Sequence, residues 1–376
     1  MRKGLYLSLH NKKVWLFSTC RADLSTILPL CKALAKLNHS QITLALCGKH
    51  DELTLKDLDK IKIDGIDILI GPILPSNENE IHAEDLSNFL IWISQVLEEN
   101  VLSVVVGDRF EILILATWII SRNNKIIHLS GGDTTPMSLD NKYRYAISEL
   151  ADLHLVIHPD HESNLLKKGI DSSKIRVVGD PALQYLDELN ITDDNLIKLK
   201  KKLNLNFTNF GLFCLHPTSN STRIINLELQ TCFKILDSYG GIVFVTKPNQ
   251  DYGSDLILKY LAERALLDKN FIMIDLSSQE EYYTLLKYAD FIIGNTSSGI
   301  WEAPSYGTPF LSIGDRQKGR LIGNNVIEIG MDYQIGVSAV NDIKNGKYKK
   351  LRNNPINPYY LPDSATLTAT IIKDFQ

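Results

Sequence analysis

Short apolar runs alternate with helical patterns along the chain, and this alternation restricts the fold more than any other sequence feature. Residues 101–107, VLSVVVG, form an uninterrupted apolar run typical of a strand buried on both faces, and the helical pattern of residues 108–120 follows directly. Repetition at this spacing indicates an α/β fold with parallel sheets and right-handed crossovers. Further strands are predicted at residues 14–19, 42–47, 66–70, 125–129, 210–215, 242–246, 271–274 and 289–293.

The chain is long enough for two domains. Its 376 residues are about twice the usual domain length. A polar segment rich in Lys and Asn, residues 187–209, separates two sets of strand and helix patterns. We therefore predict two Rossmann-like domains with a central cleft, over residues 1–186 and 187–376. The last helix is a candidate for packing back on the first domain.

Composition and charge exclude several classes of protein. The chain has 44% apolar and 22% charged residues, as globular proteins do, and a net charge of −4 that argues against nucleic acid as a partner. Five scattered cysteines predict reduced thiols and a cytoplasmic location, and no run resembles a signal peptide or a membrane span. We expect no metal, because no zinc-type spacing of His and Cys occurs. The absence of GxGxxG, P-loop and GxSxG motifs argues against dehydrogenases, P-loop kinases and esterases.

Polar residues that directly follow predicted strands are the first candidates for a binding site, because open parallel sheets bind ligands beyond the carboxyl ends of their strands. Asp108 follows one apolar run, where it either caps the next helix or faces the cleft. His216 ends another, where an imidazole can transfer a proton or donate to a phosphate. The other candidates at such positions are Arg21, residues 130–132, Asp133, Asn249 and Ser297.

The segment from Gly294 to Arg320 predicts a strand, a tight turn and a helix. An apolar run ends at Gly294, and small hydroxyl residues then lead through Gly299 into the helix. Backbone N–H groups at such a helix start suit a phosphate or diphosphate. Glu302, four residues after Ser298, shares its face and can accept hydrogen bonds from ribose hydroxyls. The alternative is an ordinary capped helix.

Other candidates each have two interpretations. Asp140 and Arg144 are four residues apart in a helical pattern. They form either an exposed ion pair or a pair that faces the cleft after the Gly-Gly turn. Arg21 and Arg320 suit phosphate oxygens, although isolated arginines are often surface charges. Tyr282 either stacks on a nucleobase or fills a helix–sheet interface.

Together these motifs resemble the hydrolysing UDP-N-acetylglucosamine 2-epimerases of sialic-acid and nonulosonic-acid pathways. The matching segments are spread over about residues 19 to 327 in the family's order. They are residues 20–23 (CRAD), 107–111 (GDRFE), 128–133 (HLSGGD), Asp140 with 144–147 (RYAI), 216–217 (HP), 248–249 (PN), 294–304 and 314–320 (GDRQKGR).

The resemblance implies a glycosyltransferase-B-like fold, a UDP-sugar substrate, no cofactor and a homodimer. It also implies that a base removes the C2 proton while UDP leaves C1, and that water then adds to the glycal. Asp108 and Asp140 would be the acid/base carboxylates, Asp133 is a further catalytic candidate, and His216 would face the leaving phosphate or transfer a proton. The substrate-binding positions would be Arg21, Glu111, Arg144, Asn249, Tyr282, Ser297, Ser298, Gly299, Glu302 and Arg320.

Departures from the family pattern are confined to the sugar side. Ser130 stands where the family usually has His or Glu, Asp133 where it has Glu, and Asn141 and Tyr145 replace an acid and a histidine. A serine accepts a proton only with a base of its own. Either Asp133 or Asp140 takes over, or the sugar differs, or activity is weak or lost. The alternatives are the same reaction on a UDP-2,4-diacetamido-trideoxyhexose, a glycosyltransferase of the same fold, and an inactive UDP-sugar binder.

Overall fold

The computed structural model describes residues 13–37, 41–50, 63–75, 80–134, 139–218, 221–248 and 253–375. Contacts within the chain divide it into two compact units. The first unit holds the chain up to Asp133, the stretch that ends at Tyr185, and the segment from Leu361 onward, while the second runs from Leu186 to Tyr360.

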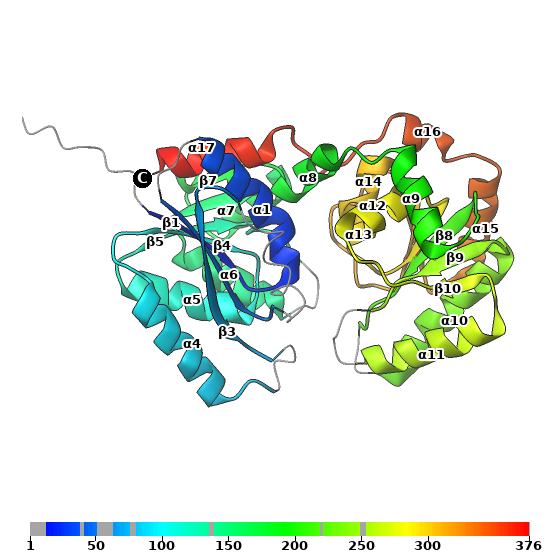
Figure 1. The fold of residues 1–376 in the computed structure, drawn as a ribbon, viewed down its shortest axis with the longest axis horizontal. Helices are drawn as coiled ribbons and strands as arrows, with labels where there is room; N and C mark the ends of the chain where they lie inside the picture. The colour runs from blue at the N-terminus through cyan, green and yellow to red at the C-terminus, as the bar shows by residue number, and fades with distance from the viewer. Residues whose placement is uncertain are drawn as a thin grey trace, which may run out of the picture. The chain divides into compact units, whose positions relative to one another are not determined.

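The first unit is a seven-stranded parallel sheet of order β3-β2-β1-β4-β5-β6-β7 (Figure 1). Its strands are β1 (Val14–Ser18), β2 (Ile42–Gly48), β3 (Ile66–Ile73), β4 (Leu102–Val106), β5 (Lys125–Leu129), β6 (Leu153–Val156) and β7 (Ile175–Val177). Its helices are α1 (Arg21–Lys36), α4 (Ala83–Val96), α5 (Phe110–Ser121), α6 (Asp140–Leu150), α7 (Pro159–Lys167) and α17 (Ser364–Asp374), while α8 (Pro181–Leu189) spans the boundary between the two units. Strand order reverses at β1, so the chain after β1 and the chain after β4 leave the sheet side by side.

Strand β1 shows how the sequence builds both faces of this sheet. Val14 and Leu16 are buried in one apolar cluster, which includes residues of α1 and α17, whereas Trp15 and Phe17 are buried in a second cluster with α4 and α5. Successive strand side chains point to opposite faces. An uninterrupted apolar run therefore supplies two cores at once, which explains why helices cover both faces.

The C-terminal helix α17 belongs to the first unit, although it follows the whole of the second unit in sequence. Ala369 and Ile372 lie in the same buried cluster as residues of α1. Lys373 Nζ donates to the carbonyl oxygen of Leu37 at 3.3 Å. In Figure 1 the red α17 runs beside the blue α1.

The second unit is a six-stranded parallel sheet of order β10-β9-β8-β11-β12-β13. Its strands are β8 (Phe210–Cys214), β9 (Ile242–Val245), β10 (Phe271–Met273), β11 (Phe291–Gly294), β12 (Phe310–Ile313) and β13 (Val326–Gly330). Its helices are α9 (Asp193–Leu203), α10 (Thr222–Tyr239), α11 (Ser254–Leu267), α12 (Gln279–Tyr288), α13 (Ser298–Trp301), α14 (Ala303–Tyr306), α15 (Tyr333–Lys344) and α16 (Lys349–Asn353). The strand order again reverses at the first strand, β8, which lies between β9 and β11.

The polar segment 187–209 is not an irregular linker, because it contains helix α9. A capping box of Thr192 and Asn195 starts the helix, and Leu199 is buried. Lys202 forms an ion pair of 2.6 Å with Glu281 of α12. The many lysines of α9 cover the solvent side of a helix that packs on the second unit. The polar composition of residues 187–209 therefore hides a helix.

Candidate functional site

The turn after β11 depends on a glycine. Gly294 has φ of +138°, and a Cβ built there would lie 1.9 Å from the carbonyl oxygen of Cys214. Any other residue at this position would therefore displace β11 from β8, the strand that carries Cys214. The glycine allows the chain to leave the sheet against a neighbouring backbone, as a turn for a ligand requires.

Asn295 connects three loops at the carboxyl edge of the second sheet. Its Oδ1 accepts from the His216 backbone N–H, and its Nδ2 donates to the His216 carbonyl oxygen, both at 2.8 Å. Its own carbonyl oxygen accepts from Arg316 Nη1 at 3.0 Å and from Gln317 Nε2 at 2.8 Å. The Asn295 side chain is fully buried. The loops after β8, β11 and β12 are thereby held together through one buried residue, with a charged donor, Arg316, among its partners.

The helix predicted after Ser297 begins at Ser298 but is interrupted. The structure has two four-residue segments, α13 and α14, which meet at Glu302. Pro304 explains the break, because its nitrogen carries no hydrogen to bond the carbonyl four residues earlier. Gly299 is buried, and a Cβ there would lie 2.4 Å from the ring of Phe310. Two single turns carry little macrodipole, so any phosphate binding here depends on local N–H and hydroxyl groups.

Tyr282 of α12 lies near two acidic side chains of the same unit. Burial, Cys214 and Glu302 raise the pKa of its phenol well above the ordinary value, while a hydrogen bond with Ser298 opposes the shift. The tyrosine is therefore a neutral hydrogen-bond donor near neutral pH. Tyr282, Ser298 and Glu302 were all predicted to bind the substrate.

Cys214 and His216 form a second pair at this edge. Cys214 Sγ lies 3.4 Å from His216 Nε2. Burial alone would raise the pKa of the thiol, but His216 and hydrogen bonds with Thr246 and Thr296 lower it to about 7. Cys214 is thus a polar neighbour of His216 rather than an inert core thiol. Arg320, in the loop after β12, donates from Nη1 to Gln317 Oε1 at 3.1 Å. Gln317 in turn donates to the Asn295 carbonyl oxygen, so Arg320 is linked to Asn295 through Gln317.

In the first unit, Arg144 of α6 connects the loops that follow β4 and β5. Its Nη2 forms a salt bridge with Asp108 Oδ2, and its Nη1 donates to the Asp133 carbonyl oxygen at 2.8 Å and to Asn141 Oδ1 at 2.9 Å. The Arg144 side chain is 4% exposed and that of Asp108 26%. Asp140, the first residue of α6, begins the same helix. The salt bridge that the structure shows for Arg144 is therefore the long-range one with Asp108, on another element, while Asp140 shares its helix.

A buried histidine supports the turn that carries Asp108. His128 Nε2 lies 2.7 Å from the Gly107 carbonyl oxygen, and Nδ1 lies 3.0 Å from Ser148 Oγ. Burial lowers the pKa of His128 to about 3, so the ring is neutral. Because a carbonyl oxygen only accepts, Nε2 carries the hydrogen and Nδ1 accepts from the hydroxyl. His128 thus positions the turn and does not exchange protons near neutral pH.

Two further polar contacts belong to the same edge. Glu111 of α5 is fully buried, and Lys49 Nζ lies 3.7 Å from its Oε2. Burial raises the pKa of Glu111, and the charge of Lys49 opposes that shift. His161 Nε2 lies 3.7 Å from Asp133 Oδ1. Glu111 is therefore a buried carboxylate held by one lysine at a distance.

Not every predicted residue can be placed. Arg21 is the first residue of α1, but its side chain lies outside the described part of the structure, and Asn249 lies outside the described residues altogether. Within the described ranges, no group of three or more His, Cys, Asp or Glu side chains is arranged to hold a metal ion. In those same ranges no helix has both the length and the apolar character needed to cross a bilayer.

Several residues of these edges are not among those predicted from the sequence. All of them contact predicted residues: Asn295, Gln317, Lys49, His161 and Cys214. Asn295 directly follows a predicted strand, a signal that could have revealed it. Lys49 and His161 lie far in sequence from their partners Glu111 and Asp133, and Cys214 reads as a core residue of its strand.

Two parallel sheets with polar loops at their carboxyl edges place the chain in the glycosyltransferase-B-like class of α/β folds. Solved structures agree with this class. UDP-GlcNAc 2-epimerase from Neisseria meningitidis, bound to UDP-GlcNAc, matches with a TM-score of 0.76 and 18% identity over 96% of this chain and all of that one. The Staphylococcus aureus MnaA–UDP structure matches with a TM-score of 0.77 and 18% identity over 97% and 96%.

The chain belongs to the UDP-N-acetylglucosamine 2-epimerase family, whose model matches residues 32–373. It is 29% identical to GDP/UDP-N,N'-diacetylbacillosamine 2-epimerase (hydrolyzing) of Campylobacter jejuni over 85% of each chain. It is 27% identical to polysialic acid biosynthesis protein P7 of Escherichia coli over 97% of this chain and 94% of the relative. Family membership supports epimerisation of a UDP-sugar as the general reaction.

Proposed function

We propose that the chain catalyses the hydrolysing 2-epimerisation of a UDP-N-acetylhexosamine, converting UDP-GlcNAc to ManNAc and UDP. The observation that carries the proposal is the pairing of Arg144 with Asp108 and with the Asp133 carbonyl. This pairing joins the Asp108 carboxylate and the Asp133 backbone to one side chain of α6, the helix that begins at Asp140. A carboxylate held in this way suits removal and return of a proton.

The reaction balances without redox chemistry. A carboxylate takes the C2 proton, the C–H electron pair becomes the C1–C2 double bond, and the C1–O bond breaks so that UDP leaves with its electron pair. Water then adds its hydroxyl to C1, while C2 receives a proton on the opposite face. A positioned base and groups that stabilise the leaving diphosphate are what this route needs.

In this proposal the second unit holds the nucleotide. His216, Ser297 and Ser298 face the diphosphate, Glu302 binds the ribose, and Tyr282 lies by the uracil. The bonds of Asn295 to His216 support this assignment, because they keep donors in place before the charge develops. Arg21, Arg320, Glu111 and Asn249 remain predicted contributors to substrate binding, and Gly299 permits the close turn.

We further propose a cytoplasmic homodimer. The cysteines among the described residues are all buried and free, which agrees with a reducing compartment. Size-exclusion chromatography with light scattering measures the assembly directly, and a monomer across micromolar concentrations would contradict the dimer.

The reaction is tested by incubating the protein with UDP-GlcNAc in deuterated water and following both products by NMR. Free ManNAc with deuterium at C2, together with equimolar UDP, is the expected result. UDP-ManNAc would indicate epimerisation without hydrolysis, and a sugar joined to an added acceptor would indicate a transferase. Unchanged UDP-GlcNAc that still binds would exclude this substrate.

The second candidate is the same reaction on UDP-2,4-diacetamido-trideoxyhexose. The name of the Campylobacter jejuni relative favours it, as does Ser130 in place of the family's larger residue on the sugar side. Comparison of kcat/KM for the two UDP-sugars separates the candidates. A preference of at least tenfold for the diacetamido sugar would assign the chain to the second.

A further inference from the structure

A cavity of about 530 Å³ lies in the second unit, away from the residues discussed so far. It is lined where strands begin: Asn209 precedes β8, Gly241 precedes β9, Asp290 precedes β11 and Pro309 precedes β12. All strands of this sheet are parallel, so the cavity lies at the amino edge, opposite the loops that contain His216 and Asn295. It is therefore separate from the candidate nucleotide site of the same unit.

Cations outnumber anions around this cavity. Lys344, Lys349 and Arg352 line it together with a single carboxylate, Asp290. Three positive charges against one negative charge leave a surplus of two, which matches a phosphate monoester near neutral pH. A single carboxylate ligand would leave part of this surplus unbalanced.

Arg352 is held in place by the protein backbone. Its Nη1 donates to the Lys287 carbonyl oxygen at 2.6 Å, and its Nη2 donates to the carbonyl oxygen of Ala289. Burial lowers the pKa of the guanidinium, and the carboxylate of Asp290 opposes that shift. These bonds occupy only some of its five N–H donors, so the remainder are available in a fixed geometry.

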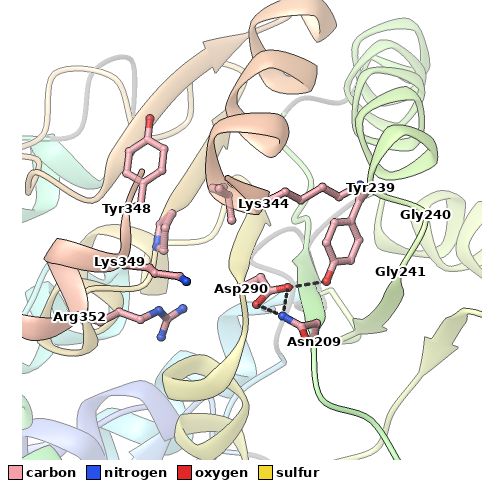
Figure 2. Close-up of a pocket in the computed structure, with 11 residues that line it drawn as sticks. Asn209, Tyr239, Gly240, Gly241, Asp290, Lys344, Tyr348, Lys349 and Arg352 are labelled. Carbon is pink, nitrogen blue, oxygen red and sulfur yellow. Dashed lines mark hydrogen bonds between the residues drawn. The ribbon is translucent and has the colours of Figure 1, made fainter. Parts of the chain in front are cut away.

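Lys349 completes an anion-binding pair with Arg352. The two residues are three apart on α16, which places them on the same side of the helix, and Figure 2 shows both side chains pointing toward Asp290. Among the described residues, the Lys349 ammonium has no hydrogen-bond or ion-pair partner. A cation without a partner next to an anchored guanidinium is an arrangement that a phosphate can bridge.

The floor of the cavity provides for the rest of a ligand. Asp290 accepts from Tyr239 Oη at 2.7 Å and from Asn209 Nδ2 at 3.1 and 3.2 Å, as the dashed lines of Figure 2 show. These donors hold the carboxylate in one orientation, and its oxygens retain lone pairs for a hydroxyl group. The volume exceeds that of a lone phosphate and lies in the range of small-molecule sites.

We propose that this cavity binds a phosphorylated, hydroxylated small molecule of the sugar-phosphate class. The phosphate lies between Lys349 and Arg352, and hydroxyl groups bond Asp290. Glucose 6-phosphate is the probe, with glucose and inorganic phosphate as its two halves. Calorimetry should give binding of glucose 6-phosphate, weaker binding of inorganic phosphate and none of glucose. Equal affinity for phosphate and glucose 6-phosphate would overturn the role of Asp290.

The matched variants are Lys349→Ala and Lys350→Ala. Both remove one exposed lysine from α16, but Lys350 does not line the cavity. Lys349→Ala should weaken binding of glucose 6-phosphate about tenfold, as loss of a charge-assisted bond does, and Lys350→Ala less than twofold. Equal losses would mean a diffuse positive field and would overturn the site. Circular dichroism checks that both variants fold.

Hydrogen exchange locates the ligand independently of the variants. Glucose 6-phosphate should slow amide exchange in residues 239–241 and 343–352 of the wild-type protein. The protection should disappear in Lys349→Ala at the same ligand concentration. Protection confined to residues 294–302 would place the phosphate at the candidate nucleotide site and would overturn the proposal.

Discussion

The two carboxyl edges of the molecule are held together by different kinds of interaction. In the second unit, Asn295 joins three loops through hydrogen bonds of its amide and its backbone, and one of the donors is the guanidinium of Arg316. In the first unit, the loops are joined by charge, through Arg144 with Asp108 and Lys49 with Glu111. Hydrogen bonds of amide groups keep their geometry over a wide pH range because amides do not titrate. The strength of an ion pair, in contrast, changes with protonation and with salt. We therefore expect the hydrogen bonds of Asn295 to depend less on pH and salt than the ion pairs of the first unit.

The largest effect should come from the glycine of the second unit. Gly294→Ala forces a Cβ against the Cys214 carbonyl oxygen, so we expect a loss of more than about 3 kcal/mol in the free energy of unfolding and loss of UDP binding. Urea unfolding and calorimetry measure both. Gly330→Ala is the control, because Gly330 also has positive φ but open space around it, and should cost about 1 kcal/mol. Equal losses would show that φ alone matters.

Removal of the charged connection in the first unit should come next. Arg144→Ala leaves Asp108 without its salt-bridge partner, and we expect about 2–3 kcal/mol of destabilisation with a fall in kcat of at least tenfold. Arg144→Lys keeps the charge but not the fork and should lie between wild type and Arg144→Ala. Unchanged UDP affinity in both variants would sharpen the contrast between the halves. A loss of UDP binding without a change in kcat would contradict it.

Glu228 tests whether a buried carboxyl makes the stability of the second unit depend on pH. This residue of α10 is buried, Thr218 Oγ1 donates to it at 3.1 Å, and burial raises its pKa to about 7. A raised carboxyl pKa favours the protonated, folded state, so its contribution is complete below the ordinary pKa near 4.5 and is lost as pH rises through about 7. Glu228→Gln should therefore flatten this fall in stability by about 1–3 kcal/mol in thermal unfolding. A Glu228→Gln protein with the wild-type pH profile would rule out this source.

Asn295→Asp probes the amide itself. The aspartate keeps an oxygen for the His216 N–H but loses the donor to the His216 carbonyl, so we expect about 1–2 kcal/mol of weaker UDP binding. Fluorescence titration of UDP measures it. Asn325→Asp is a control, since that buried amide bonds Gly299 and Thr308 and does not touch His216. Two results together would contradict the positioning of His216 by Asn295. They are an equal loss of UDP binding in Asn325→Asp and an unchanged kcat in Asn295→Asp.

The smallest change concerns Ser130 on the sugar side. If loss of the family's acid limits turnover, Ser130→Glu should raise kcat for UDP-GlcNAc a fewfold, and Ser130→Gln, of the same shape without charge, should not. Ser130 has φ of +66°, and the cost of about 1 kcal/mol for this conformation is shared by serine, glutamate and glutamine, so the backbone does not favour either variant. Steady-state kinetics measure the effect. No gain beside good wild-type turnover would assign the base to Asp133 or Asp140.

The sequence by itself determined the α/β class, most strand positions and the turn at Gly294. These follow from apolar periodicity and from glycine, which are local properties of the chain. It also placed Asp108 and His216 at strand ends. It did not reveal helix α9 within residues 187–209, where Leu199 is the buried residue among many lysines. It also did not reveal the break between α13 and α14, where Pro304 interrupts the hydrogen bonds.

Only the tertiary structure decided which polar groups meet. Arg144 and Asp108 are 36 residues apart, Asn295 and His216 are 79 apart, and α17 returns to α1 from the far end of the chain. Such pairs depend on strand order and on the loops between strands, neither of which leaves a period in the sequence. Periodicity predicts which side of a helix or strand is buried, and the strand order of the folded sheet determines which element that side packs against.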